Sequence, residues 1–276
     1  MTESSTPAPS LDLPSPATEL AGQHALVSGA AGGIGQALVR ALLARGAGVH
    51  ALDVDEAGLA SLRDTLPRAA AARLYTQQVD VRDAQAVEDA VAAAETRMGP
   101  IDKLACVAGI LQMGRITDLT LAEWAETFTV NTTGPFLLCR AVAKRMMPRR
   151  RGAIVNVSSN AATTPRAAMG AYAASKAALT QMTRCLALEL APYGIRCNIV
   201  SPGSTDTEMQ RAMWRQGSSI EQVIQGSASG FRLGIPLGKI ATPDEVADGI
   251  LFLLSERASH ITLHDLRIDG GATLDQ

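Results

Sequence analysis

The chain has 276 residues, a formal net charge of −2 and a hydrophobic content of 47%. This length suits one large α/β domain with a sizeable core. The near-neutral charge argues against nucleic acid or an acidic membrane surface as a partner, and no apolar run approaches the roughly 20 residues of a membrane span.

The N-terminal residues differ in composition from the rest of the chain. Residues 1–20 are rich in Pro, Ser and Thr and lack the basic and apolar regions of a secretion signal, which predicts a disordered extension. The four cysteines are not paired as C-x-x-C, as expected of reduced thiols in a cytoplasmic protein. His260 and His264 have no third ligand nearby, so no metal site is predicted.

Short β-like runs alternate with longer helical patterns along residues 21–276. The predicted strands are His24–Ser28, Gly48–Asp53, Arg73–Asp80, Lys103–Val107, Ala153–Val157, Arg196–Val200 and Leu266–Asp269. Helical patterns lie near 34–46, 83–98, 121–147, 170–191 and 243–254. This alternation predicts an α/β fold, a Rossmann-type, doubly wound parallel sheet of seven strands in a single domain, with helices on both faces.

The alternation is interrupted at residues 204–236, which we call the lid segment. Met209, Met213 and Trp214 have helical spacing and are followed by a stretch rich in Gly and Ser. This composition suits a mobile cover over a substrate site.

The sequence SGAAGGIG at residues 28–35 lies between the first predicted strand and the first predicted helix. Glycines there permit a tight turn, and the helix N-terminus offers free N–H groups to a pyrophosphate. The pattern predicts a dinucleotide site that includes Gly29, Gly32, Gly33, Ile34 and Gly35.

Asp53 ends the second predicted strand, where a carboxylate accepts hydrogen bonds from the adenosine ribose and repels a 2′-phosphate. No Arg or Lys lies between Val49 and Ala60 to receive such a phosphate. The cofactor is therefore predicted to be NAD rather than NADP. Asp80 and Val81 close the third strand, where a side chain and a backbone amide would meet the adenine.

Tyr172 and Lys176 are four residues apart in a helical pattern, so they share one face of the helix. A free tyrosine has a pKa of about 10, and a nearby lysine cation is expected to lower it. Ser159, upstream of both, would hold a substrate oxygen beside the phenol. These groups suit proton transfer between an alcohol and a carbonyl.

With these residues in place, the chain resembles the short-chain dehydrogenase/reductase family over roughly residues 22–273. The matching pieces are SGAAGGIG at 28–35, Asp80-Val81, Ala108-Gly109, Asn131, Ser159, Tyr172-x-x-x-Lys176 and Pro202-Gly203. They follow the family's order and spacing. One departure is Cys106-Val107 before Ala108-Gly109, where the family often has an asparagine of structural importance.

The resemblance implies a role for each catalytic position. Tyr172 would be the acid/base, and Lys176 would lower its pKa and bind the nicotinamide ribose. Ser159 would orient the substrate oxygen, and Asn131 would hold a water in the proton relay. The cofactor would also contact Ala108, Gly109, Pro202 and Gly203, together with Thr205 and Thr207 at the carboxamide and pyrophosphate.

A narrower resemblance is to the bacterial 2,3-dihydro-2,3-dihydroxybenzoate dehydrogenases, a group within this family. The segments that carry it are 109–114, Glu123-Trp124, 164–166, 201–210, 233–240, 260–264 and 269–273. It implies oxidation of the C3 alcohol of trans-2,3-dihydro-2,3-dihydroxybenzoate to 2,3-dihydroxybenzoate, the catechol acid of siderophores. Because the matching segments include the lid segment, they bear on substrate choice as well as on fold.

Arg166 is the predicted ligand of the substrate carboxylate. It lies in the loop that leaves the fifth predicted strand, at the carboxyl end of the sheet, where ligands bind. Its planar guanidinium suits a bidentate carboxylate contact. Met169, Met209 and Gln210 are further predicted substrate contacts.

Gln112 is also predicted to face the substrate, and it leaves an alternative open. The dihydroxybenzoate enzymes commonly have an arginine here, and glutamine keeps the hydrogen bonding but removes the cation. Either Arg166 suffices for the carboxylate or the substrate differs. The alternative substrate is trans-2,3-dihydro-3-hydroxyanthranilate, which has an amine at C2 and would give 3-hydroxyanthranilate.

Two other functions are less well supported by the sequence. A 3-oxoacyl-carrier-protein reductase would require NADPH, which Asp53 disfavours. A non-catalytic NAD-binding sensor would tend to lose Tyr172 or Lys176, and both are present. The C-terminal sequence from Asp269 to Leu274 resembles segments that pack between subunits in this family, which implies a homotetramer.

Overall fold

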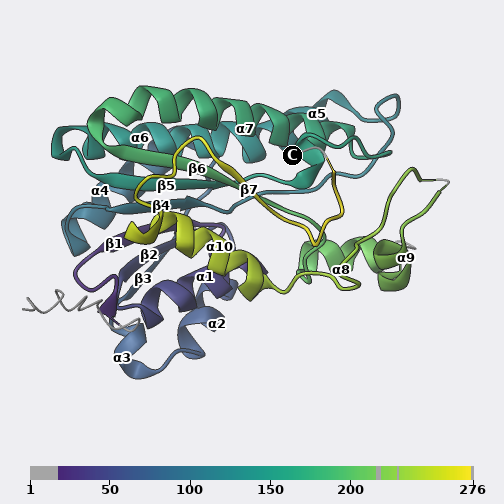
Figure 1. Cartoon of the computed structure of the whole chain (residues 1–276). Helices are drawn as coiled ribbons and strands as arrows, with labels where there is room; N and C mark the ends of the chain where they lie inside the picture. Colours follow the sequence, from purple (N-terminus) through teal and green to yellow (C-terminus); the bar gives the residue numbers. More distant parts are fainter. Residues whose placement is uncertain (1–17, 216–218, 229, 275–276) are drawn as a thin grey trace, which may run out of the picture.

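The computed structural model describes residues 18–215, 219–228 and 230–274, and a seven-stranded parallel sheet lies at its centre (Figure 1). The strand order is β3-β2-β1-β4-β5-β6-β7, with every neighbouring pair parallel. The strands are β1 (His24–Ser28), β2 (Gly48–Asp53), β3 (Leu74–Gln78), β4 (Lys103–Cys106), β5 (Gly152–Val157), β6 (Ile195–Pro202) and β7 (Asp265–Ile268). The predicted fold class is confirmed.

Helices cover both faces of the sheet (Figure 1). One face carries α1 (Gly33–Ala44), α2 (Glu56–Asp64), α3 (Arg68–Ala71) and α10 (Pro243–Leu254). The other carries α4 (Ala84–Met98), α5 (Leu121–Phe128), α6 (Gly134–Arg149) and α7 (Gly170–Leu190). Each face has its own apolar cluster, with Leu38 and Leu254 in one and Val91 and Leu138 in the other. Burial of each such side chain contributes about 1.5–3 kcal/mol.

Several helices begin at side chains that satisfy their free N–H groups. Thr242 and Glu245 form a reciprocal capping box at the start of α10, and Asp83 accepts from the Gln85 and Ala86 amides at the start of α4. Such caps each contribute about 1 kcal/mol. They fix where the helix begins, so the preceding loop at the sheet edge has a defined path.

The helix predicted over residues 121–147 is divided in the structure. A π-helical turn, Thr129–Thr133, separates α5 from α6. The Asn131 side chain lies in this turn, where its Oδ1 accepts from the Ile110 amide at 2.8 Å and its Nδ2 donates to the Ile110 carbonyl at 2.9 Å. The prediction of one continuous helix was wrong because these contacts to a distant loop favour one wider turn, a feature common at functional sites.

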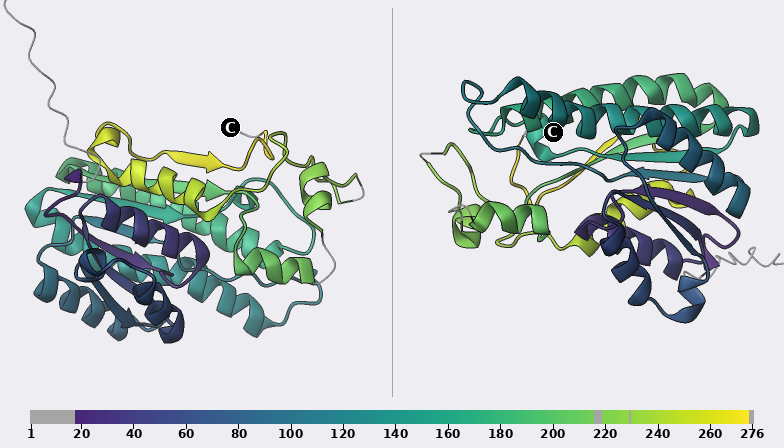
Figure 2. Two further views of the ribbon diagram at one scale, coloured as in Figure 1. Left: turned by 90° about the horizontal axis from the view of Figure 1, so that it is seen from below. Right: turned by 180° about the vertical axis from the view of Figure 1, so that it is seen from behind.

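The lid segment contains two short helices beyond the carboxyl ends of the strands (Figure 2). These are α8 (Glu208–Arg215) and α9 (Ile220–Gln225). α8 includes the predicted helical set of Met209, Met213 and Trp214. The described parts of the lid segment therefore include two helices.

The predicted N-terminal extension, residues 1–20, lies outside the described residues over 1–17. At its end, Leu20 is buried and Glu19 pairs with Arg45 at 2.7 Å. The packed domain therefore reaches back to Glu19 rather than beginning at residue 21. Among the described helices, none combines the length and apolar character needed to cross a membrane.

His50 gives the fold a testable dependence on pH. Its buried ring lies in β2, with Nε2 3.1 Å from Gln77 Oε1, and burial lowers its pKa from 6.5 to about 4. Between these values the unfolded chain binds more protons than the folded chain, so stability falls as the pH falls from about 6.5 to about 4. The expected loss is about 3 kcal/mol.

Urea unfolding at pH 7 and at pH 4.5 would measure this loss. His50→Phe should unfold with a smaller difference between the two pH values than the wild type does. His260→Gln, which changes an exposed histidine, should keep the full difference. Equal pH dependence in the wild type and His50→Phe would show that His50 is not the group responsible.

Candidate active site

Two adjoining cavities open at the carboxyl ends of the strands, where parallel α/β sheets bind ligands. The cofactor cavity, of about 550 Å³, extends from the glycine turn to Asp53 and Asp80. The catalytic cavity, of about 160 Å³, is bounded by β5, α7 and the lid segment. The residues that line both are Ile34, Val107, Gly109, Thr207 and Met209. The two cavities therefore adjoin directly.

The glycine turn approaches neighbouring backbone too closely for side chains at two positions. Gly29 has a φ of 71°, and a Cβ there would lie 2.4 Å from the Ala108 amide nitrogen. A Cβ on Gly35 would lie 2.0 Å from the Gly29 carbonyl oxygen. The structure brings the predicted nucleotide-end residues together, since the cofactor cavity is lined by Gly29, Gly32, Gly33, Ile34, Gly35, Asp53, Asp80, Val81, Ala108 and Gly109.

Backbone amides hold the Asp53 carboxylate at the end of β2. Its Oδ2 accepts from the Ala31 amide at 2.9 Å, and its Oδ1 accepts from the Asp55 amide at 3.0 Å. Each carboxylate oxygen can accept a second hydrogen bond. The site therefore offers an oriented, negatively charged acceptor for hydroxyl donors, and the cavity as a whole fits a dinucleotide.

Arg82 is a cofactor-cavity residue that the sequence interpretation missed. Its guanidinium binds the Asp80 carboxylate at 2.6 Å and lies 3.4 Å from Glu126. The hydrogen bonds from Arg82 lower the pKa of Asp80. Asp80, the predicted adenine contact, is thus part of an ion pair rather than a free carboxylate. The carboxylates of Asp80 and Glu126 together balance the positive charge of Arg82.

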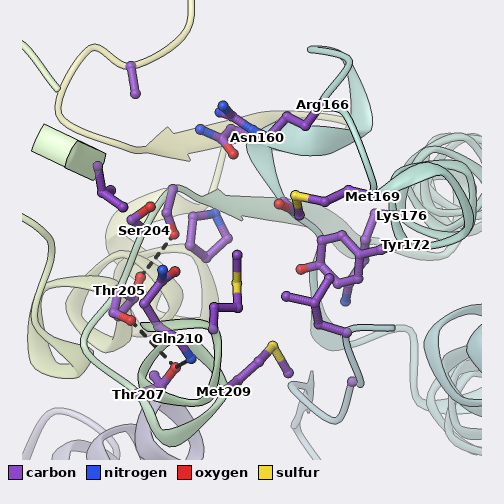
Figure 3. Close-up of a pocket in the computed structure, with 18 of the residues that line it drawn as sticks. Asn160, Arg166, Met169, Tyr172, Lys176, Ser204, Thr205, Thr207, Met209 and Gln210 are labelled. Carbon is purple, nitrogen blue, oxygen red and sulfur yellow. Dashed lines mark hydrogen bonds between the residues drawn. The ribbon is translucent and has the colours of Figure 1, made fainter. Parts of the chain in front are cut away.

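Ser159, Tyr172 and Lys176 all line the catalytic cavity, and Figure 3 shows Tyr172 and Lys176 side by side there. Lys176 Nζ donates to the Val157 carbonyl at 2.8 Å and lies 5.9 Å from the centroid of the Tyr172 ring. Ser159 Oγ accepts from the Ala161 amide at 3.1 Å, which leaves its proton available to the phenol oxygen or a substrate. The three side chains therefore lie at one cavity, and their predicted roles in proton transfer stay predictions.

Asn131 lies behind this group rather than in the cavity wall. Its Nδ2 donates to Ser175 Oγ at 3.0 Å, and that hydroxyl donates to the Tyr172 carbonyl at 2.8 Å. The π-helical turn therefore connects the loop after β4 to the catalytic turn of α7. The predicted role of Asn131 in holding a water stays a prediction.

The pKa values at the catalytic centre differ from the sequence-based expectation. Burial raises the pKa of Tyr172, and the hydrogen bond with Ser159 lowers it by a smaller amount. Burial also lowers the pKa of Lys176 to about 8. The expected fall in the tyrosine pKa is not found, because desolvation is the dominant effect and it disfavours both charged forms.

The substrate side of the catalytic cavity contains most of the residues predicted for it. Arg166, Met169, Met209 and Gln210 line it, the first pair beside α7 and the second pair on the opposite side in α8 (Figure 3). Pro202, Gly203, Thr205 and Thr207, which were predicted as cofactor contacts, also line it, and Thr207 lines the cofactor cavity as well. Burial, followed by the nearby charge of Arg232, lowers the pKa of Arg166.

Gln112 is the one predicted substrate contact that the structure does not bring to either cavity. Its Nε2 donates to Glu123 Oε1 at 3.1 Å. Glu123 also accepts from Thr120 in the capping box of α5, so Gln112 belongs to the polar contacts at that helix start. Gln112 therefore has a partner that the sequence pattern did not reveal.

Arg232 and Met213 line the catalytic cavity and were not among the predicted substrate contacts. Met213 shares a helix face with Met209, and that spacing is a signal from which it could have been found. Arg232 follows a stretch without helical or strand periodicity, so its direction depends on the path of the lid segment.

The fold, the nucleotide cavity and the Ser–Tyr–Lys group define an oxidoreductase that uses NAD or NADP. The family model described as "Enoyl-(Acyl carrier protein) reductase" matches residues 29–273. The chain belongs to the short-chain dehydrogenase/reductase family.

Among its relatives, the "2,3-dihydro-2,3-dihydroxybenzoate dehydrogenase" of Bacillus subtilis is 50% identical over 92% of this chain and 97% of its own length. The Escherichia coli enzyme of the same name is 44% identical over 93% of this chain and 99% of its own length. A solved short-chain dehydrogenase/reductase oxidoreductase from Burkholderia thailandensis is 37% identical, with a TM-score of 0.81 over 91% of this chain and 92% of its own.

Proposed function

We propose that this protein oxidises the C3 alcohol of trans-2,3-dihydro-2,3-dihydroxybenzoate with NAD and yields 2,3-dihydroxybenzoate, as in catechol siderophore biosynthesis. One observation carries the proposal: the Arg166 guanidinium faces the same small cavity as the Tyr172 phenol. A cavity of about 160 Å³ suits a ligand smaller than the drug-sized molecules that fill about 300–1,000 Å³. A single ring with one carboxylate and one reactive alcohol meets these requirements. The names and full-length similarity of the relatives support this choice.

The chemistry follows from the side chains that surround the reactive alcohol. Tyr172, as the phenolate, takes the hydroxyl proton, and Ser159 donates a hydrogen bond to the same substrate oxygen. The charge of Lys176, 5.9 Å from the ring, favours this phenolate against the burial that raises the Tyr172 pKa. When bound, NAD supplies the acceptor for the hydride that leaves C3. The resulting ketone tautomerises to the aromatic catechol, which makes the oxidation strongly downhill.

NAD rather than NADP is part of the proposal. Asp53 places a negative charge where the ribose hydroxyls are expected, and a 2′-phosphate there would be repelled. Arg82 lines the cofactor cavity, but its positive charge is already paired with Asp80 and Glu126. Both features favour a free ribose 2′-hydroxyl.

The hydroxyanthranilate alternative depended on the loss of a cation at position 112. Gln112 contacts Glu123 and lines neither cavity, so its position gives no support for a substrate with an amine at C2. We therefore propose only the dihydroxybenzoate reaction. Its test is NADH formation at 340 nm from each of the two dihydro acids. Faster turnover of the amino acid substrate would reverse the choice.

Arg166→Ala should weaken binding of the dihydro acid. Loss of a charged hydrogen bond costs about 1.5–3 kcal/mol, so kcat/KM should fall about tenfold to 150-fold, mainly through KM. Steady-state rates over a range of substrate concentrations would measure it. Arg215→Ala is the matched control, because Arg215 is an exposed lid arginine paired with Glu208. An unchanged KM in Arg166→Ala would remove Arg166 from the substrate site.

We also infer a homotetramer and a cytoplasmic location. Leu274, near the C-terminal end, and Leu237, whose amide donates to the Gly270 carbonyl, are 81% and 71% exposed, which supports burial against another copy. The described cysteines are all free thiols, in keeping with a reducing compartment. Light scattering at several protein concentrations would test the assembly, and a monomer throughout would overturn it.

A further inference from the structure

Arg232 lies in a short hairpin of the lid segment. The Ser227 amide donates to the Arg232 carbonyl, and the Arg232 amide donates to the Ser227 carbonyl, both at 2.9 Å. The Arg232 side chain lines the catalytic cavity, and its Nη2 lies 3.8 Å from Met169 Sδ. Since Met169 is three residues after Arg166 in the loop leading to α7, the two arginines approach the cavity from different parts of the chain.

Glycines at both ends fix the path of this hairpin. Gly226 has a φ of 81°, and a Cβ there would lie 2.5 Å from the Arg232 carbonyl oxygen. Gly234 has a φ of 88°, and its Cβ would lie 2.5 Å from the Ile224 carbonyl oxygen. The backbone on one side of the hairpin thus contacts the backbone on the other side, with no room for a side chain at Gly226 or Gly234. Arg232 is thereby directed by the backbone of the lid segment.

The positive charges of Arg166 and Arg232 are not balanced by an ion pair with any described residue. Among residues 18–215, 219–228 and 230–274, neither Arg166 nor Arg232 has a carboxylate within ion-pair distance. Asp269 attracts Arg166 through space, but its oxygens already accept from Asn160, Thr273 and the Gly271 amide. Two guanidinium groups of like charge at one small cavity are stabilised when an anion lies between them.

We propose that Arg232 and Arg166 together form a clamp for the carboxylate of the substrate, with Arg232 supplied by the lid segment. The inference rests on the proposed function and adds a specificity-determining residue to it. Two planar guanidinium groups offer several fixed donors to one carboxylate. The clamp selects carboxylated ring alcohols over neutral ones, and it makes the position of the lid segment depend on the carboxylate.

The test compares ligands that differ only by the carboxylate. The NADH-loaded enzyme is titrated calorimetrically with 2,3-dihydroxybenzoate and with catechol. Arg232→Gln should weaken binding of 2,3-dihydroxybenzoate about tenfold to 100-fold and leave catechol binding unchanged. Arg232→Lys should lie between Arg232→Gln and the wild type, because it keeps the charge but loses the planar fork. Arg215→Gln, the exposed lid control, should bind both ligands as the wild type does.

Two outcomes would overturn the clamp. One is wild-type affinity of Arg232→Gln for 2,3-dihydroxybenzoate, and the other is equal weakening for both ligands, which would indicate only a structural role. Turnover separates this failure from that of the proposed function. If the wild type oxidises the dihydro acid and Arg232→Gln does so with unchanged KM, only the clamp fails. If the wild type does not oxidise the dihydro acid, the proposed function fails whatever the titrations show.

Discussion

Tyr172→Phe should lower kcat for NADH formation by about 10²–10⁴-fold, the usual contribution of a positioned acid/base group. Tyr172, as the phenolate, is the group of this centre that accepts the alcohol proton directly, since Ser159 is not basic and Lys176 donates to a backbone carbonyl. Removing only the hydroxyl keeps the ring packing in the cavity. NADH binding, followed by fluorescence, should therefore stay close to the wild-type value.

The matched control is Tyr193→Phe, which removes a phenol hydroxyl outside the two cavities, in the 3₁₀ turn after α7. It should leave kcat unchanged. Retained turnover in Tyr172→Phe would refute the catalytic assignment. A loss of NADH affinity as large as the loss of rate would point to a damaged cleft instead.

Asp53→Asn should shift the cofactor preference. Asparagine keeps an acceptor for the Ala31 amide but removes the negative charge that disfavours a 2′-phosphate. The ratio of kcat/KM for NAD to that for NADP should fall by about tenfold to 150-fold, which corresponds to about 1.5–3 kcal/mol for hydrogen bonds to a charged group. Steady-state rates with both cofactors would measure the ratio.

Asp64→Asn, at the end of α2 and outside the cofactor cavity, removes one negative charge without touching that cavity. It separates the local effect from a general change in charge, so its ratio should equal that of the wild type. A wild-type enzyme that prefers NADP would contradict the assignment of Asp53 before any variant is made.

The sequence predicted elements well where the signal is local. β1, β2 and α10 have the predicted bounds, because apolar runs and capping residues mark their ends. α2 was not predicted, since it is short and buries only Leu59 and Leu62. The π-helical turn depends on a contact between Asn131 and a loop far away in the sequence, which periodicity cannot reveal.

The same difference between local signals and contacts of distant residues applies to the active site. The glycine turn and the Tyr172–Lys176 pair belong to short motifs, so the sequence was enough to locate them. The surroundings of three other side chains depend on polar contacts to distant residues and on the path of loops, which the sequence does not show. These side chains are Arg82, Arg232 and Gln112. The raised pKa of Tyr172 likewise reflects the depth of its burial, which spacing in a sequence does not give.

The π-helical turn at Thr129–Thr133 also sets the angular phase between two helices. Each residue of an α-helix advances the chain by about 100° around its axis. The wider turn lets α6 keep its apolar side on the sheet while Asn131 faces Ile110 and Ser175. Deleting one residue there would restore a regular helix but rotate one of these two contacts out of place. Natural variation in chain length should therefore avoid this turn and collect in loops away from the cleft.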